Sequence, residues 1–141
     1  MDSTTEQGPW LGQCLCGAVR YQADSIKPAM AHCHCSMCRK FHGAAFATYG
    51  VTPHQDFHWL SGEVLLGRYQ AANGTVRQFC RNCGSSLTFA ASGCQGEVVE
   101  FALGTLDTPL LQQPDAHIYT DYKATWCDIT DELPCFSEGR G

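Results

Sequence analysis

Short stretches in which apolar and polar residues alternate recur along the chain, and Gly, Pro or Asn separates one from the next. In residues 19–23 (Val-Arg-Tyr-Gln-Ala) the alternation is that of a half-buried strand. Segment 36–41 predicts one helical turn capped by Ser36, with its first amides directed toward neighbouring cysteines. We therefore expect a mainly β fold of short antiparallel strands with little helix. The other expected strands are 43–49, 57–62, 64–69, 76–79, 87–90 and 98–103.

The length and composition favour one globular domain. A chain of 141 residues encloses a single core, and 44% of its residues are hydrophobic. We expect this domain to span residues 12–136, with a flexible N-terminal segment at 1–11 and a C-terminal tail at 137–141.

The charge pattern excludes some partners and indicates a compartment. The formal net charge is −5, and Lys and Arg are scattered singly, so we expect no nucleic acid partner. We expect no membrane association, because no apolar run approaches the roughly 20 residues that span a bilayer. The first eight residues lack the basic start and apolar run of a secretory signal, which predicts a cytosolic location. Cysteines stay reduced there, so ten of them indicate metal binding or catalysis before disulfides.

Three cysteines fall within six residues, in the pattern Cys-x-Cys-x-x-Cys at Cys33, Cys35 and Cys38. Zinc prefers four ligands, so these thiols predict a site whose fourth position belongs to a histidine, to a distant residue, or to water and substrate. Alternation along an extended backbone puts His32 and His34 on the face opposite Cys33 and Cys35, which favours an open three-cysteine site over a site closed by histidine. Cys127, beside Trp126, remains the distant candidate for a fourth ligand.

Two further cysteine pairs lie in turns flanked by glycine, Cys14 with Cys16 and Cys80 with Cys83. Together they provide the four thiols of a closed structural zinc site. The alternative is a redox Cys-x-x-Cys motif at Cys80 and Cys83, but such a motif belongs at the start of a helix in an α/β pattern, which this chain lacks.

The other candidate groups stand singly. A lone cysteine is most often a small buried hydrophobe, and a lone histidine most often a surface or hydrogen-bonded group. Basic residues around the cysteines could lower thiol pKa values or hold a carboxylate. These groups are Cys94, Cys127 and Cys135; His42, His54, His58 and His117; and Arg39, Lys40, Arg77 and Arg81.

Five motifs together resemble the glutathione-dependent formaldehyde-activating enzyme family, which includes centromere protein V. The resemblance runs over residues 12–134. It implies a β-tent-like zinc fold, a structural zinc at Cys14, Cys16, Cys80 and Cys83, and a second zinc at Cys33, Cys35 and Cys38. It also implies reversible addition of glutathione to formaldehyde by a carbon-sulfur lyase. The motifs are residues 12–21 (GQCLCGAVRY), 32–40 (HCHCSMCRK), 79–87 (FCRNCGSSL), 104–107 (GTLD) and 117–126, from His117 to Trp126.

The combined prediction is a zinc-dependent carbon-sulfur lyase with two zinc ions, acting on glutathione or a related thiol and its aldehyde adduct. His34 or His42 is the candidate for moving the hydroxyl proton, and Arg39 is the cationic neighbour of the thiolates. The alternative is a binding or scaffold module in which both zinc ions are structural. Homo-oligomer formation is left open.

Overall fold

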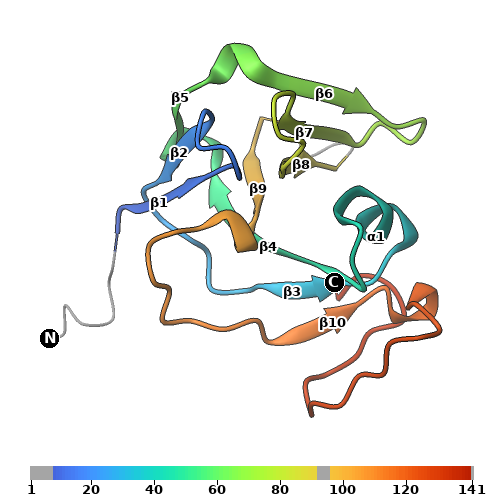
Figure 1. The fold of residues 1–141 in the computed structure, drawn as a ribbon. Helices are drawn as coiled ribbons and strands as arrows, with labels where there is room; N and C mark the ends of the chain where they lie inside the picture. Colours follow the sequence, from blue (N-terminus) through green and yellow to red (C-terminus); the bar gives the residue numbers. More distant parts are fainter. Residues whose placement is uncertain (1–7, 92–95, 141) are drawn as a thin grey trace, which may run out of the picture. The chain divides into compact units, whose positions relative to one another are not determined.

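Strands make up most of the regular structure in the computed structural model, which describes residues 8–91 and 96–140 (Figure 1). The expected mainly β class is confirmed, since this part of the chain contains ten strands and one α-helix. Two compact units can be distinguished, Met1–Lys27 with Gly50–Gln112 and Pro28–Tyr49 with Gln113–Gly141. Cys94 lies outside the described residues.

The first unit contains two antiparallel sets of strands. One set has the order β1-β2-β5 and the other the order β9-β8-β7-β6. A turn at Asn73-Gly74 joins β6 to β7, as the sequence predicts, and the Thr75 amide donates to the Asn73 side chain at 3.0 Å. The strands are β1 (Trp10–Gln13), β2 (Arg20–Ala23), β5 (Phe57–Ser61), β6 (Leu66–Gln70), β7 (Val76–Cys80), β8 (Ser86–Ala90) and β9 (Val98–Ala102).

An aromatic cluster fills the core between these strands. On β2, Arg20 is exposed and Tyr21 is fully buried, so the alternation read from the sequence is the alternation of the folded strand. The Tyr21 ring stacks on Phe57 at 5.2 Å and lies 5.5 Å from Phe101. Burying each such ring stabilises the fold by roughly 2–3 kcal/mol. A Cβ at Gly50 would lie 2.5 Å from the Phe101 ring, so this approach requires glycine.

The second unit is built around a short parallel pair of strands, β3 (Ala31–Cys33) and β10 (Ala116–Ile118). Their register places His32 opposite His117 and Cys33 opposite Ile118. The start of β4 (Ala47–Pro53) pairs with β3 in the antiparallel sense, and this strand continues into the first unit. Helix α1 (Ser36–His42) connects β3 to β4.

Some element boundaries differ from the prediction. Gly43 ends α1 in the left-handed conformation (φ 61°), so β4 begins at Ala47 and not at residue 43. Residues Glu63–Leu65 form a 3₁₀ turn, which delays β6 to Leu66. Strands β1, β3 and β10 were not predicted, and β1 begins inside the segment expected to be flexible. Three further 3₁₀ turns span His54–Asp56, Leu103–Thr105 and Thr120–Tyr122.

Within residues 8–91 and 96–140, no helix is both long and apolar enough to cross a membrane.

Candidate metal centres and the histidine row

The two paired-cysteine turns of the first unit come together as one group of four thiols. The ligand atoms of Cys14, Cys16, Cys80 and Cys83 all lie within 4.8 Å of one another. The Sγ atoms of Cys14 and Cys16 are 3.6 Å apart, and those of Cys16 and Cys80 are 3.9 Å apart. Sulfurs at about 2.3 Å from one ion in a regular tetrahedron are about 3.8 Å apart. The group therefore fits a tetrahedral ion such as zinc.

Each turn presents its sulfurs through a left-handed glycine, with φ 81° at Gly17 and 84° at Gly84. Backbone amides point at the sulfurs: Val19 N–H donates to Cys14 at 3.3 Å and Cys83 N–H to Cys80 at 3.5 Å. Cys80 ends a strand and Cys83 lies in the turn before the next one. This position is typical of a metal-binding turn. A redox Cys-x-x-Cys motif would instead lie at the start of a helix, so the structure does not support the redox alternative.

Polar neighbours favour thiolates at the more accessible side of the group. A hydrogen bond with the Ser85 hydroxyl lowers the pKa of Cys83 to about 5. The Asn82 amide, which donates to Cys16 Sγ at 3.2 Å, lowers the pKa of Cys16. Burial instead raises the pKa of Cys80, whose side chain has no exposed surface. Burial disfavours the thiolate form on the enclosed side of the group, and a bound divalent cation would balance that negative charge.

The second unit holds the group of three thiols. The ligand atoms of Cys33, Cys35 and Cys38 lie within 4.8 Å of one another, and no fourth Cys, His, Asp or Glu of residues 8–91 and 96–140 joins them. Hydrogen bonds with Cys35 and Cys38 are the main cause that raises the pKa of Cys33. The three crowded thiols therefore do not ionise together without a cation. Like the first group, this donor set is one that zinc accepts.

Helix α1 positions two of these thiols. Cys35, and not the predicted Ser36, is the N-cap: its Sγ accepts the Cys38 amide at 3.2 Å, so a helix amide does point at a thiol as expected. Cys38 lies in the first turn and is buried. The cap fixes Cys35 relative to Cys38, while pairing of β3 with β4 and β10 fixes Cys33.

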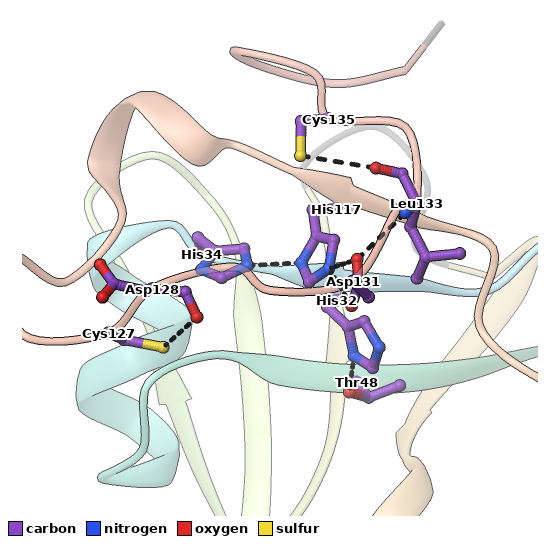
Figure 2. Close-up of polar contacts among 9 residues, drawn as sticks. All are labelled: His32, His34, Thr48, His117, Cys127, Asp128, Asp131, Leu133 and Cys135. Carbon is purple, nitrogen blue, oxygen red and sulfur yellow. Dashed lines mark hydrogen bonds and ion pairs between the residues drawn. The ribbon is translucent and has the colours of Figure 1, made fainter.

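His34 directly follows β3 and begins a row of hydrogen-bonded side chains (Figure 2). Its Nε2 is 2.8 Å from Nδ1 of His117, and Nε2 of His117 is 3.0 Å from Oδ2 and 3.2 Å from Oδ1 of Asp131. We call His34, His117 and Asp131 the histidine row. The second ring nitrogen of His34, Nδ1, is buried and has no hydrogen-bond partner in the described part of the chain.

His32 flanks the row without joining it. Its ring lies 4.9 Å from that of His117, and its Nδ1 hydrogen-bonds with the Thr48 hydroxyl at 2.7 Å. Burial, followed by the charge of His117, lowers the pKa of His34 to about 4, and the same two causes lower the pKa of His32. Burial and the neighbouring imidazole therefore disfavour the protonated form of both rings.

The other candidate residues make local contacts. His42 Nε2 is 2.6 Å from the Tyr49 hydroxyl, and Arg39 Nε donates to the Tyr122 carbonyl at 3.2 Å. Cys127 Sγ contacts the Asp128 carbonyl at 4.0 Å and lies outside the three-thiol group. In the first unit, Arg77 lies over the Phe89 ring and Arg81 donates to the Val64 carbonyl. The structure thus brings together the seven predicted cysteines in two groups, while His34 and His42 hydrogen-bond with different partners, His117 and Tyr49.

Sequence reasoning missed the roles of His117 and Asp131. They lie 83 and 97 residues beyond His34, and no spacing motif connects them. The parallel pairing of β3 with β10 brings His117 into place, and the His34 amide donates to the Ile118 carbonyl at 3.0 Å. His117 was visible only as a single histidine in the last motif of the resemblance.

Fold and sites together define a small, mainly β protein with two thiol groups able to hold metal ions. The sequence profile of the family described as glutathione-dependent formaldehyde-activating enzyme matches residues 9–122. This chain belongs to that family.

Individual relatives agree with this assignment. An uncharacterized lyase of Schizosaccharomyces pombe is 33% identical over 79 residues, which is 56% of each chain. A Halomonas elongata protein named as a putative glutathione-dependent formaldehyde-activating enzyme is 29% identical over 135 residues, covering 89% of this chain and 85% of its own. The crystal structure of a Rhodobacter sphaeroides protein superposes with a TM-score of 0.60 at 24% identity, over 70% of this chain and 89% of the other, and shows the same fold.

Proposed function

We propose that this protein is a zinc-dependent carbon-sulfur lyase that makes and breaks a thiol–aldehyde adduct, with glutathione and formaldehyde as the leading substrate pair. The observation that carries the proposal is the three-thiol group, which has no fourth protein ligand among the described residues. Membership of the family and the names of its relatives support the substrate class.

The two thiol groups have different roles in this proposal. The group of four satisfies a tetrahedral ion completely, so its zinc stabilises the fold. Zinc held by Cys33, Cys35 and Cys38 would supply a Lewis acid that favours the thiolate form of a substrate thiol.

The reaction requires one proton acceptor and one proton donor. In the direction of synthesis, the thiolate sulfur attacks the aldehyde carbon, a C–S bond forms, and the carbonyl electron pair takes a proton to give the hydroxyl. In the direction of cleavage, the hydroxyl loses that proton, the C–S bond breaks, and its electron pair returns to sulfur. His34 is the leading candidate for the acceptor, because its Nδ1 is a buried nitrogen with no partner among residues 8–91 and 96–140.

Two residues of α1 complete the candidate site. His42, hydrogen-bonded to Tyr49, is the alternative group for proton transfer. Arg39 follows Cys38 in sequence, and its guanidinium, which donates to the Tyr122 carbonyl, carries a positive charge on this helix. Three thiolates on one zinc leave a formal charge of −1, which this cation partly offsets.

The experiment is exchange NMR with ¹³C-formaldehyde and glutathione, with the same mixture lacking protein as the reference for the uncatalysed reaction. The wild-type protein should increase the exchange rate between free aldehyde and adduct, and Cys35→Ser should abolish the increase. Cys127→Ser is the matched control, since its sulfur lies outside the thiol group, and it should keep full activity. Absence of acceleration with glutathione and with other small thiols would favour the binding-module alternative.

A further inference from the structure

A cavity of about 360 Å³ lies within the first unit, and no cysteine of either thiol group lines it. Its walls come mainly from β5, β7, β8 and β9 and from the 3₁₀ turns on either side of β5. All of these residues belong to Gly50–Gln112, so one compact unit builds the whole cavity. Binding sites for small molecules have volumes of roughly 300–1,000 Å³, and this cavity is within that range.

Two facing walls give the cavity its shape. Strand pairing sets Gln78 opposite Thr88 and Thr88 opposite Phe101, so these side chains share one face of β7, β8 and β9. The other wall is β5, where the Phe57 ring lies 6.2 Å from the Phe101 ring. The rings of Phe57 and Trp59 are 4.9 Å apart and meet at 87°. They form an aromatic corner that suits a planar apolar group.

The side-chain amide of Gln78 supplies a hydrogen-bond donor in this wall. Thr88, which is only 4% exposed, donates from Oγ1 to Oε1 of Gln78 at 2.8 Å. This bond uses the oxygen of the amide and leaves the two N–H groups of Nε2. Neither N–H group has a partner among residues 8–91 and 96–140. A ligand in the cavity would therefore meet a donor whose orientation is already fixed.

The charge of the lining disfavours anions. Among the described residues that line the cavity, Glu63 provides a carboxylate, and no Lys or Arg is present. Val76 and Ala90, which face each other on β7 and β8, add only apolar surface. An anion would lose its hydration here without gaining a cationic partner. The lining is thus better suited to a neutral ligand.

We propose that this cavity binds a small neutral molecule with a planar apolar body and a carbonyl oxygen, of the class of aromatic amides and ketones. The planar body would lie in the corner formed by Phe57 and Trp59, and the carbonyl oxygen would accept from Nε2 of Gln78. This site is separate from the proposed lyase reaction and depends on neither metal ion.

The test is a titration of the full-length ¹⁵N-labelled protein with three probes, followed by NMR. Benzamide has both the ring and the carbonyl, toluene lacks the carbonyl, and benzoate has the same planar shape with a negative charge. The signals to follow are the side-chain amide of Gln78 and the indole N–H of Trp59. The other two tryptophans, Trp10 and Trp126, do not line the cavity and serve as internal references.

We expect benzamide to shift both signals in a saturable manner and to leave the two reference indoles unchanged. Toluene lacks an acceptor for the Gln78 amide, so it should bind roughly 5-fold more weakly than benzamide. Benzoate should bind at least roughly 5-fold more weakly than benzamide, because its charge is desolvated without a cationic partner.

Two variants locate the binding. Gln78→Met keeps the length of the side chain and removes the donors, so it should weaken benzamide binding roughly 5-fold and leave toluene binding unchanged. Gln22→Met is the matched control, because the Gln22 amide donates to Asp24 at 2.8 Å outside the lining, and it should not alter binding. Ala90→Leu fills space opposite Val76 and should weaken the binding of benzamide and of toluene.

Each part of the proposal can fail separately. Benzamide that shifts neither the Gln78 nor the Trp59 signal would overturn the site. A Gln78→Met protein with unchanged benzamide affinity, or with equal losses for benzamide and toluene, would overturn the hydrogen bond. Benzoate that binds as tightly as benzamide would overturn the preference for neutral ligands. Full benzamide affinity in a folded Ala90→Leu protein would show that the probe binds elsewhere.

Discussion

Cys35→Ser separates metal binding at the three-thiol group from the stability of the fold. Cys35 does two things at once, because its sulfur is a candidate ligand and also caps α1 by accepting the Cys38 amide at 3.2 Å. Serine is a good N-cap, so its hydroxyl can accept the same amide while providing a much poorer ligand for zinc. The variant should therefore remain folded and lose one ion.

Cys35→Ala is the comparison that measures the cap. It removes the ligand and the cap together, and loss of an N-cap costs about 1 kcal/mol. For a chain of this size, about 1 kcal/mol corresponds to roughly 3–5 °C in the unfolding temperature. Both variants lack the same ion, so the difference between them reports the helix cap alone.

The assay combines elemental analysis of bound metal with thermal unfolding followed by circular dichroism. We expect two ions in the wild type, one in each variant, and an unfolding temperature for Cys35→Ala that is roughly 3–5 °C below that of Cys35→Ser. Two ions and full lyase activity in Cys35→Ser would refute the assignment of this cysteine. Equal unfolding temperatures for the two variants would refute the cap.

Three further changes test other parts of the account. Cys80→Ser replaces the fully buried thiol of the four-cysteine group and should remove the other ion. Because saturating metal contributes roughly 4 kcal/mol to the free energy of unfolding, the unfolding temperature should fall by at least about 10 °C. A fall of only a few degrees would contradict a structural ion. Gly12→Ala should lower the free energy of unfolding by about 1–3 kcal/mol, because its Cβ would lie 2.3 Å from the Tyr21 hydroxyl, and an unchanged free energy would argue against this packing. Burial raises the pKa of Glu100 to about 7, so its contribution to stability is complete below about pH 4.5 and is lost as pH rises through 7. In urea unfolding, the free energy of unfolding of the wild type should fall by roughly 3 kcal/mol relative to that of Glu100→Gln between pH 4.5 and 8. A difference between the two proteins that does not change with pH would exclude ionisation of Glu100 as its cause.

The sequence was sufficient where a pattern is local. Alternation along β2, the Asn73-Gly74 turn and the helical turn after Cys35 each depend on neighbours within a few residues. The seven cysteines could be grouped because Cys-x-Cys and Cys-x-x-Cys spacings directly reflect turns that present two sulfurs to one ion.

Features that depend on distant pairing could not be predicted. The parallel register of β3 with β10 joins residues more than 80 positions apart, and three-residue strands carry too little alternation to be recognised. The histidine row depends on this register, so the sequence did not predict the row either. The capping role of Cys35 was assigned to Ser36 because serine is a preferred N-cap and cysteine is not. The sequence indicates His34 only as a histidine near the cysteine motif, and its buried nitrogen without a hydrogen-bond partner among the described residues is visible only in the fold.

The most direct test of the central claim is the sulfur coordination of bound zinc, measured by X-ray absorption on freshly purified protein while glutathione is added. Two ions per chain, with the average number of sulfur ligands rising from about 3.5 to about 4 per ion, would show that the three-thiol group accepts a substrate thiol. One ion per chain, or two ions whose sulfur count does not change with glutathione, would contradict a thiol-binding zinc at Cys33, Cys35 and Cys38.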